Sequence, residues 1–370
     1  MRIGVPKEIK SQEYRVGLTP PSVAELVAAG HEVIIETNAG GGIDFDDSDY
    51  TGVGARIVPD AKSVFEQADM IVKVKEPQPV EIAMLEPRHT LFTYLHLAAS
   101  RDLTEGLLKS GATCIAYETV TGPKGGLPLL KPMSEVAGRM SVQVGAHFLE
   151  KEQGGRGILL GGVPGVAPAR VAILGGGTSG VNAAQMAVGM RADVTIYDIS
   201  NERLAELDMF FSSQIKTAYA SKAAIEAAVA KAHLVIGAVL VPGAAAPKLV
   251  TRDMLKTMKR GSVLVDIAID QGGCFETSKP TTHDDPVYEI DGVTHYCVAN
   301  MPGAVARTSA FALNNATLPF VLRLANMGAE KAMQSDPHLA AGLNTSNGKI
   351  RYEAVAQAFG MAHDPWNGTN

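Results

Sequence analysis

Short apolar runs alternate with turns and amphipathic segments along most of the chain. In the first part of the sequence the apolar runs are Arg2–Val5, His31–Glu36, Asp69–Val74, Thr90–Leu95 and Ala112–Tyr117. Strands that alternate with helices in this way predict a mostly parallel sheet with right-handed crossovers. We therefore expect this part of the chain to form one α/β unit.

The segment 123–132, PKGGLPLLKP, interrupts this pattern with proline and glycine and indicates a domain boundary. Beyond it, Ser134–Lys151 carries apolar residues at a spacing of four, which predicts one face of a long helix. A second alternation of apolar runs and helices begins at Arg170 and ends with YCVAN, whose last residue is Asn300. This part of the chain predicts a second α/β unit.

After Asn300 the pattern is helical to the end of the chain, and no further strand is expected. The roughly 65 residues that remain are too few for a domain with its own core, so we expect them to pack on the first unit. The predicted fold has two doubly wound α/β domains with a cleft between them and a helical C-terminal segment. One domain is discontinuous, residues 1–128 plus 306–370, and the other spans residues 129–305.

Composition and charge narrow the classes of function. The net charge is −6, and no block of like charges supplies the clustered basic face that nucleic acid requires. The longest apolar stretch, residues 234–247, is too short to span a bilayer, and the first ten residues lack the apolar core of a signal peptide. The three cysteines lie far apart, and no His, Asp or Glu cluster has metal-ligand spacing. We expect a cytoplasmic protein without a metal, a nucleic-acid partner or a membrane.

The segment 175–180, GGGTSG, contains a GxGxxG pattern formed by Gly175, Gly177 and Gly180. The pattern alone is weak in a glycine-rich chain, but here it follows an apolar strand and opens a helix. In a Rossmann-type loop the first glycine permits the tight turn, the second lets backbone approach a pyrophosphate, and the third lets helix pack on strand. The helix N-terminus supplies N–H groups for the phosphates. The alternative is a packing turn that holds no ligand.

Asp198 ends the next apolar run, VTIYD, where a dinucleotide-binding domain places an acidic residue. A carboxylate there accepts both ribose hydroxyls and repels a 2′-phosphate, which favours NAD over NADP. Arg203 follows five residues later and has two interpretations, a contact to the cofactor that would admit a 2′-phosphate or a solvated helix residue. We predict NAD.

Four polar residues follow expected strands: Arg15, Lys75 and His96 in the first unit and Asp270 in the second. Ligands of open α/β sheets bind outside the carboxyl ends of the strands, so we expect the four to converge on one cleft. Taken singly, each has an ordinary alternative, because a lone histidine after a strand is commonly structural and a lone lysine is commonly solvated. Their shared position favours function.

The chain resembles the alanine dehydrogenase family over nearly its whole length, through MRIGVPKEIK, VKVKEP, LFTYLHLA, LGGGTSG, LVIGAVLVPG, VDIAIDQGGCFE and YCVANMPGAV. Relatives of that family are the NAD-binding part of proton-translocating transhydrogenase and, more distantly, saccharopine-type dehydrogenases. The resemblance implies NAD-dependent oxidative deamination of L-alanine to pyruvate and ammonia, together with the reverse amination. It also implies a homo-oligomer, a hexamer.

By this resemblance Arg15 and Lys75 bind the substrate carboxylate and keto oxygen, His96 is the acid/base, Asp270 is the second catalytic residue, and Asn300 contacts the substrate. His96 and Asp270 are expected to face each other across the nicotinamide. The residues implied for the cofactor are Ser134, Gly175, Gly177, Thr178, Ser179, Gly180, Asp198, Arg203, Val239, Leu240, Ile267, Ala268, Ile269, Asp270, Lys279, Val298, Ala299, Asn300 and Met301.

Two positions depart from the family pattern on the adenosine side. Ala220 stands where a serine is found, and Lys279 stands where an arginine is common. Two other functions compete with the amino-acid dehydrogenase: a transhydrogenase-type subunit that passes hydride between nucleotides, and an NAD-binding sensor without catalysis. The presence of Arg15, Lys75 and His96 favours an enzyme that handles an amino acid, and the presence of His96 and Asp270 disfavours the sensor.

Overall fold

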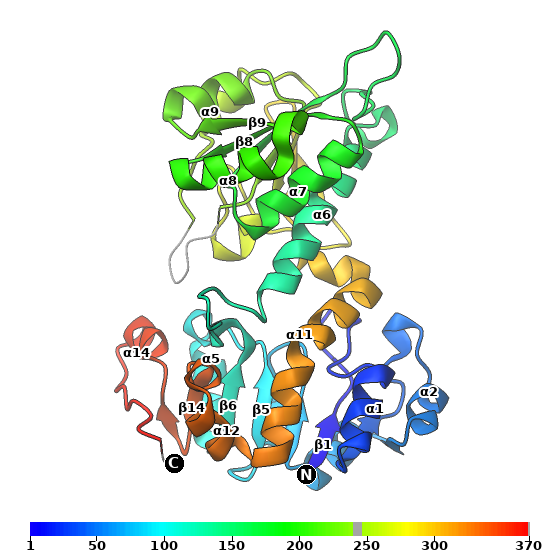
Figure 1. Ribbon diagram of the computed structural model, residues 1–370, viewed down its shortest axis with the longest axis vertical. Coiled ribbons are helices and arrows are strands. Elements are labelled where there is room, and N and C mark those ends of the chain that lie inside the picture. The colour runs from blue at the N-terminus through cyan, green and yellow to red at the C-terminus, as the bar shows by residue number, and fades with distance from the viewer. Residues whose placement is uncertain (240–245, 369–370) are drawn as a thin grey trace. The chain divides into compact units, whose positions relative to one another are not determined.

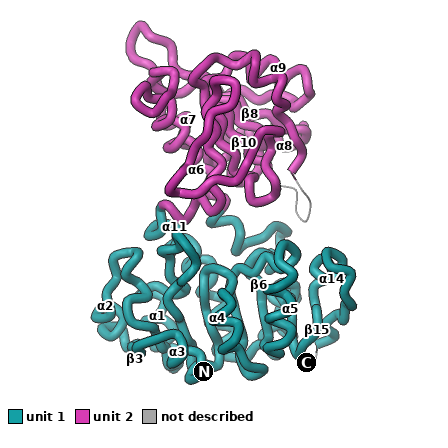
Figure 2. The backbone as a smooth tube through the Cα atoms, turned by 180° about the vertical axis from the view of Figure 1, so that it is seen from behind, with its two compact units in different colours: residues 1–133, 305–370 teal, residues 134–304 magenta. Residues whose placement is uncertain are grey.

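The computed structural model describes residues 1–239 and 246–368, and the chain divides into two compact units. Unit 1 contains residues 1–133 and 305–370, and unit 2 contains residues 134–304 (Figure 2). The chain thus leaves unit 1 once, builds all of unit 2, and returns. Both units are α/β structures (Figure 1), which confirms the predicted class.

Among the residues described, the sheet of unit 1 has eight strands in the order β15-β14-β6-β5-β4-β1-β2-β3. Strands β1 to β6 pair with one another in parallel, whereas β14 pairs antiparallel with β6 and β15 pairs antiparallel with β14. The strands are β1 Arg2–Val5, β2 Glu32–Glu36, β3 Arg56–Val58, β4 Met70–Val72, β5 Thr90–Thr93, β6 Thr113–Ala116, β14 Leu343–Ser346 and β15 Lys349–Ile350.

Helices cover both faces of this sheet. In Figure 1, α1 and α11 lie before it, and the reverse view in Figure 2 shows α3, α4 and α5 on the other face. Side chains of α3 and α5 share one apolar core with the strands, in which Phe65, Leu91 and Leu107 are fully buried. The helices are α1 Pro20–Ala28, α2 Asp47–Gly52, α3 Ala61–Gln67, α4 Pro79–Ile82, α5 Arg101–Ser110, α11 Ala306–Met327, α12 Ala329–Ser335, α13 Pro337–Ala340 and α14 Glu353–Phe359.

The expectation that no strand follows Asn300 is wrong. Strands β14 and β15 form an antiparallel hairpin, and β14 pairs with β6 at the edge of the parallel sheet. Its residues Asn344, Thr345 and Ser346 are polar yet buried, so the apolar alternation that marks a strand is missing from the sequence. Asn344 is accommodated because its amide donates to the hydroxyl of Thr119 and to a backbone carbonyl.

Among the residues described, unit 2 has a seven-stranded sheet in the order β12-β13-β11-β10-β7-β8-β9, with only β12 antiparallel. The residues that directly follow β11 form a 3₁₀ turn, η6, Ile267–Gln271. The strands are β7 Arg170–Leu174, β8 Asp193–Asp198, β9 Lys216–Tyr219, β10 Leu234–Gly237, β11 Val263–Asp266, β12 Val287–Ile290 and β13 Val293–Tyr296. The helices are α6 Lys131–Phe148, α7 Thr178–Gly189, α8 Asn201–Phe211, α9 Lys222–Val229 and α10 Arg252–Leu255.

Both sheets are wound in the same order. In unit 1 the sequence β3-β2-β1-β4-β5-β6, and in unit 2 the sequence β9-β8-β7-β10-β11-β13, place the first strand of each unit in the middle. The winding direction reverses between β1 and β4 and between β7 and β10. In open sheets of this kind ligands bind beyond the carboxyl ends of the strands at that reversal, so each unit has one topologically defined place for a ligand.

His233, which precedes β10, makes the stability of unit 2 sensitive to acid. Its Nδ1 accepts the backbone N–H of Arg170 at 2.9 Å, and Lys259 Nζ lies 3.3 Å from its Nε2. Burial, together with Lys259, Arg156 and Arg170, lowers the pKa of His233 to about 4. The unfolded chain therefore binds this proton more readily, and the stability contribution of neutral His233 is lost as the pH falls from about 6.5 towards 4.

We predict that His233→Gln reduces the acid sensitivity of unfolding, because an amide oxygen can still accept the Arg170 N–H and does not protonate. The fall in Tm between pH 7 and pH 5 should be smaller than in the wild type by about 2–4 °C. Thermal unfolding followed by circular dichroism at both pH values measures this. An unchanged difference between the two pH values would contradict the assignment.

Candidate active site

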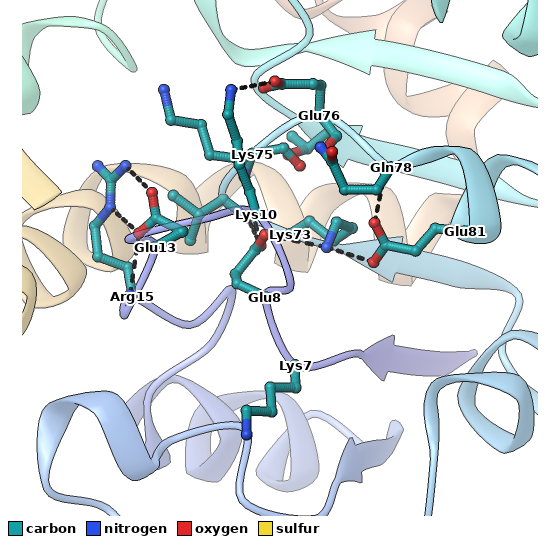
Figure 3. Close-up of polar contacts among 12 residues, drawn as sticks. Lys7, Glu8, Lys10, Glu13, Arg15, Lys73, Lys75, Glu76, Gln78 and Glu81 are labelled. Carbon is teal, nitrogen blue, oxygen red and sulfur yellow. Dashed lines mark hydrogen bonds and ion pairs between the residues drawn. The ribbon is translucent and has the colours of Figure 1, made fainter. Parts of the chain in front are cut away.

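The reversal point of unit 1 is lined by charged side chains from two loops. Glu8, Glu13 and Arg15 follow β1, and Lys73 and Lys75 follow β4 (Figure 3). Strands β1 and β4 are hydrogen-bonded neighbours, so both loops leave the sheet side by side at its carboxyl edge. Arg15 and Lys75 were predicted from the sequence, and the other three were not.

Arg15 is held by Glu13 rather than left in solvent. Its Nε and Nη2 each donate to one carboxylate oxygen of Glu13 at 2.6 Å, and Nη1 lies 3.0 Å from the sulfur of Met133. Arg15 is only 2 % exposed. Burial acts to raise the pKa of Glu13, but the hydrogen bonds and charge of Arg15 outweigh it and the pKa is lowered. The pair therefore stays ionised, and the plane of the guanidinium is fixed.

Lys75 lies close to the same pair. Its positive charge contributes to the lowered pKa of Glu13, and its backbone carbonyl accepts the hydroxyl of Thr93 at 3.0 Å. The edge of unit 1 thus presents two cations, a guanidinium and an ammonium, around one carboxylate. Such a pair suits a small ligand that carries a carboxylate and a second oxygen.

His96 follows β5 at the same edge of the sheet. Its backbone has φ 51°, a left-handed conformation that is uncommon for residues other than glycine. Glu118 holds it there, because one carboxylate oxygen accepts the backbone N–H of His96 at 2.6 Å and lies 3.9 Å from the ring Nδ1. The imidazole stacks on Tyr94, with centroids 5.9 Å apart and planes 6° apart, while half of its side chain stays exposed.

Tyr94 links His96 to the charged pair. It is buried, and burial raises its pKa while the charge of Arg15 acts in the opposite direction, which places the phenol near the guanidinium. Unit 1 therefore brings together the three residues that the sequence indicated for this unit, Arg15, Lys75 and His96. The structure adds Glu13, Glu118 and Tyr94 to this set.

In unit 2 the glycine motif occupies the reversal point after β7. Gly175 has φ 104°, which favours glycine. A Cβ on Gly180 would lie 1.9 Å from the carbonyl oxygen of Gly175, whereas a Cβ on Gly177 would meet no atom of the described residues within 4 Å. Two of the glycines are therefore required by the fold itself. Gly177 is not, and an open space in front of its backbone is what a bound phosphate needs.

Asp198 and Arg203 both hold the middle of this loop. One oxygen of Asp198 accepts the N–H of Gly176 at 2.7 Å and the other accepts the N–H of Ser200 at 2.9 Å. Arg203 Nε donates to the carbonyl of Gly176 at 2.7 Å, and its Nη1 is ion-paired with Glu206. The positive charge of Arg203 is thus balanced by a neighbouring carboxylate on the same helix.

Asp270 lies on the 3₁₀ turn η6 and is exposed. The turn is organised by Asp266, which is fully buried and accepts the N–H groups of Ala268 at 3.1 Å and Cys274 at 2.8 Å. Burial raises the pKa of Asp266, and these hydrogen bonds with that of Ser278 act against the rise. Sequence reasoning missed Asp266, although its position at the end of an apolar strand is a usable signal.

The remaining cofactor candidates lie on the first turns of α6 or after strand ends of unit 2. Helix α6, which carries Ser134, packs closely on the start of α7, since a Cβ on Gly138 would lie 2.2 Å from the carbonyl oxygen of Ser179. Asn300 has φ 64°, and its carbonyl contacts His283. Leu240 lies outside the described residues. Within the described part, the others are half-exposed Val239 and Ile267, buried Ala268, Ile269, Val298 and Met301, and exposed Ala299 and Lys279.

Across 1–239 and 246–368, no three His, Cys, Asp or Glu side chains come together in a way that could bind a metal ion. In the same ranges no helix is both long and apolar enough to cross a membrane.

Comparison with known proteins gives matches over nearly the whole chain. The family model described as alanine dehydrogenase/PNT, N-terminal domain, matches residues 4–137, and its C-terminal counterpart matches residues 141–353. The alanine dehydrogenase of Halomonas elongata is 63% identical over 363 residues, 98% of each chain. That of Bacillus subtilis is 56% identical, covering 99% of this chain and 96% of its own.

Two solved structures match nearly the whole chain as well. A structure of L-alanine dehydrogenase matches with a TM-score of 0.95 at 57% identity, covering 97% of this chain and 99% of that one. A transhydrogenase structure from Sinorhizobium meliloti matches with a TM-score of 0.81 at 24% identity, covering 96% of this chain and all of the other. At that identity the second match shows a shared fold alone.

The glycine loop yields a prediction that separates ligand binding from folding. Gly177→Ala should leave Tm unchanged and weaken dinucleotide binding by about tenfold, because the methyl group enters space that a pyrophosphate would fill. Gly180→Ala should instead cost about 1–3 kcal/mol of stability through the clash with Gly175. Titration with NADH, followed by its fluorescence, and thermal unfolding measure the two effects. Equal NADH affinity in Gly177→Ala and wild type would exclude this loop as the phosphate site.

Proposed function

We propose that this chain oxidises L-alanine with NAD and water to pyruvate, ammonium, NADH and a proton, and runs the reverse amination, because it belongs to the alanine dehydrogenase/PNT family. The observation that carries the proposal is the paired cations Arg15 and Lys75 at the reversal point of unit 1, in a chain whose unit 2 carries a dinucleotide-type glycine loop. Such a pair is suited to the carboxylate and carbonyl of a small 2-oxo acid.

Arg15 binds the substrate carboxylate in this proposal. A guanidinium presents five N–H donors in a fixed fork, and Glu13 accepts from Nε and Nη2. We assign the substrate carboxylate to the end formed by Nη1 and Nη2, where two parallel hydrogen bonds fix the position of Cα. Lys75 lies against the keto oxygen and polarises the carbonyl for attack by ammonia.

When bound, NAD would supply the acceptor for the hydride that leaves Cα of alanine. The substrate becomes a cationic imine, and the carboxylate of Asp270 stabilises that charge. His96 removes a proton from the water that attacks the imine carbon and returns it to the nitrogen. It then takes the hydroxyl proton as the C–N bond breaks, so that the carbonyl forms and ammonia leaves. Glu118 supports this role, because its carboxylate accepts the backbone N–H of His96 and lies 3.9 Å from the ring Nδ1.

NAD is the proposed cofactor, and unit 2 is proposed to bind it. The open space before Gly177 and the uncapped backbone at the start of α7 suit the pyrophosphate. Asp198 is proposed to accept the ribose hydroxyls, and its charge disfavours a 2′-phosphate. Arg203 does not reverse this preference, because Glu206 and the carbonyl of Gly176 hold its guanidinium.

The homohexamer expected from the resemblance stays a prediction. Light scattering, which measures the molar mass of the assembly, tests it. Three apolar side chains near α8 support self-association, since Ile199, Met209 and Phe210 are 74%, 83% and 64% exposed. Apolar surface of this kind is commonly covered in protein interfaces.

A spectrophotometric assay tests the proposed function. NADH should form with L-alanine and NAD, and NADH should be consumed with pyruvate and ammonium. His96→Ala should lower kcat at least about 10²-fold in both directions, the lower bound for loss of a positioned acid/base, with NADH affinity unchanged. Activity of the folded His96→Ala protein within a few-fold of wild type would end this mechanism. Hydride transfer from NADH to an NAD analogue without any amino-acid activity would favour the transhydrogenase alternative.

We predict a strong preference of the wild type for NAD over NADP. Asp198→Ala should raise kcat/KM with NADP relative to NAD by at least about tenfold, while kcat with NAD changes little. Asp193→Asn is the matched control, because Asp193 lies at the opposite end of β8 in an ion pair with Lys216. Equal kcat/KM of the wild type with both cofactors would show that Arg203 overrides the carboxylate.

A further inference from the structure

Lys73 is a lysine buried between two glutamates. Its side chain has no exposed surface, and its Nζ lies 3.1 Å from Glu8 and 2.7 Å from Glu81, whose side chains are 2% and 1% exposed (Figure 3). The three residues come from the loop after β1, the loop after β4 and helix α4. We call them the Glu8–Lys73–Glu81 cluster. None of its members has a part in the mechanism proposed above.

The cluster holds the backbone of the segment that carries Lys75. One oxygen of Glu8 contacts Lys73, and the other accepts the N–H of Val74 at 2.6 Å and lies 3.4 Å from the N–H of Lys75. The second oxygen of Glu81 accepts the N–H of Gln78 at 2.7 Å. The segment is therefore fixed by carboxylates at both of its ends.

The opposite side of the same segment is tied to the end of β5 and to the residue that follows it. The N–H of Tyr94 donates to the carbonyl of Val74 at 3.3 Å, and the Thr93 hydroxyl donates to the carbonyl of Lys75 at 3.0 Å. Both peptide groups that flank the Cα of Lys75 are thus engaged. The direction in which its side chain leaves the backbone is set by Glu8 on one side and Thr93 on the other.

Burial of these charges is costly, and Lys73 makes it possible. Burial raises the pKa of Glu8, while Lys73 and the amide of Val74 act against that rise. Burial acts to lower the pKa of Lys73, but Glu8 and Glu81 outweigh it and the pKa is raised. Lys73 therefore remains charged, and its charge favours the ionised form of Glu8 against the effect of burial. Apolar residues of similar volume would often be as stable as such a cluster, so stability alone does not explain it.

We propose that the Glu8–Lys73–Glu81 cluster positions Lys75 for the substrate carbonyl, with Glu8 as the positioning residue and Lys73 as the group that maintains its charge. The inference rests on the proposed function, since it concerns Lys75 in its substrate-binding role. It assigns Glu8 and Lys73 no contact with the substrate. Their effect on the reaction passes through the backbone of Lys75.

A double-mutant cycle tests this route. In Glu8→Gln the amide nitrogen faces either the Val74 N–H or the Lys73 ammonium, so one of these two contacts is lost. Lys73→Met removes the cation and keeps a side chain of similar length. Each should raise the Kd of pyruvate for the enzyme–NADH complex, measured without ammonium, by about tenfold, because small displacements of a binding group cost one to two orders of magnitude. The affinity for NADH should not change. In a Lys75→Ala background each should alter the Kd of pyruvate less than twofold.

Asp69→Asn is the matched control. Asp69 precedes β4 and pairs with Arg2 at the start of β1, so it joins the same two strands at their other ends; pyruvate binding should not change. Tm of every variant is measured as well. If Lys73→Met fails to fold, Glu8→Gln, which keeps volume and an acceptor oxygen, decides the outcome.

The possible failures are distinguishable. Equal effects of Glu8→Gln in the wild-type and Lys75→Ala backgrounds, or no effect in either, would overturn the positioning role while leaving the proposed function intact. A wild type without L-alanine activity, whose pyruvate binding is also unaffected by Lys75→Ala, would instead remove the proposed function on which the inference rests.

Discussion

In each sheet the chain first adds strands outward on one side of its starting strand and then returns to add strands on the other side. The loops after the two strands at the reversal therefore run in opposite directions. They leave the carboxyl ends of these two strands uncovered. Unit 1 places Arg15 and Lys75 at this point, and unit 2 places the glycine loop there. The site residues of both units follow from this one topological constraint, although no side chain in one unit corresponds to a side chain in the other.

The two units use this position by different physical means. Unit 2 leaves it open with glycine, so that backbone N–H groups and a helix N-terminus do the recognition. Unit 1 fills it with side-chain charges, and each buried cation there has a carboxylate partner, Glu13 for Arg15 and Glu8 with Glu81 for Lys73. Backbone recognition needs few specific residues, whereas buried side-chain charges need a surrounding set of counter-charges to remain ionised.

This difference explains what the sequence could predict. Gly175, Gly177, Gly180 and Asp198 were identified because they stand at a fixed spacing within a short stretch of sequence. Most strands were identified from the apolar residues of a single short segment. Glu8, Glu13, Glu118 and Asp266 were not, because an isolated acidic residue in a sequence is indistinguishable from a solvated one and their partners are brought in by the fold. Strand β14 was missed for a related reason: three of its four buried residues are polar, and Asn344 among them is accommodated by hydrogen bonds.

The charge balance of unit 1 also bears on the proposed reaction. In their ionised forms Arg15, Lys73 and Lys75 carry three positive charges, and Glu8, Glu13 and Glu81 carry three negative ones, so the set is neutral. Zwitterionic alanine adds no net charge to it. Pyruvate adds one negative charge and ammonium one positive charge, which again sum to zero. These six residues therefore balance one another on either side of the reaction, and Arg15 and Lys75 can orient the substrate carboxylate in both directions.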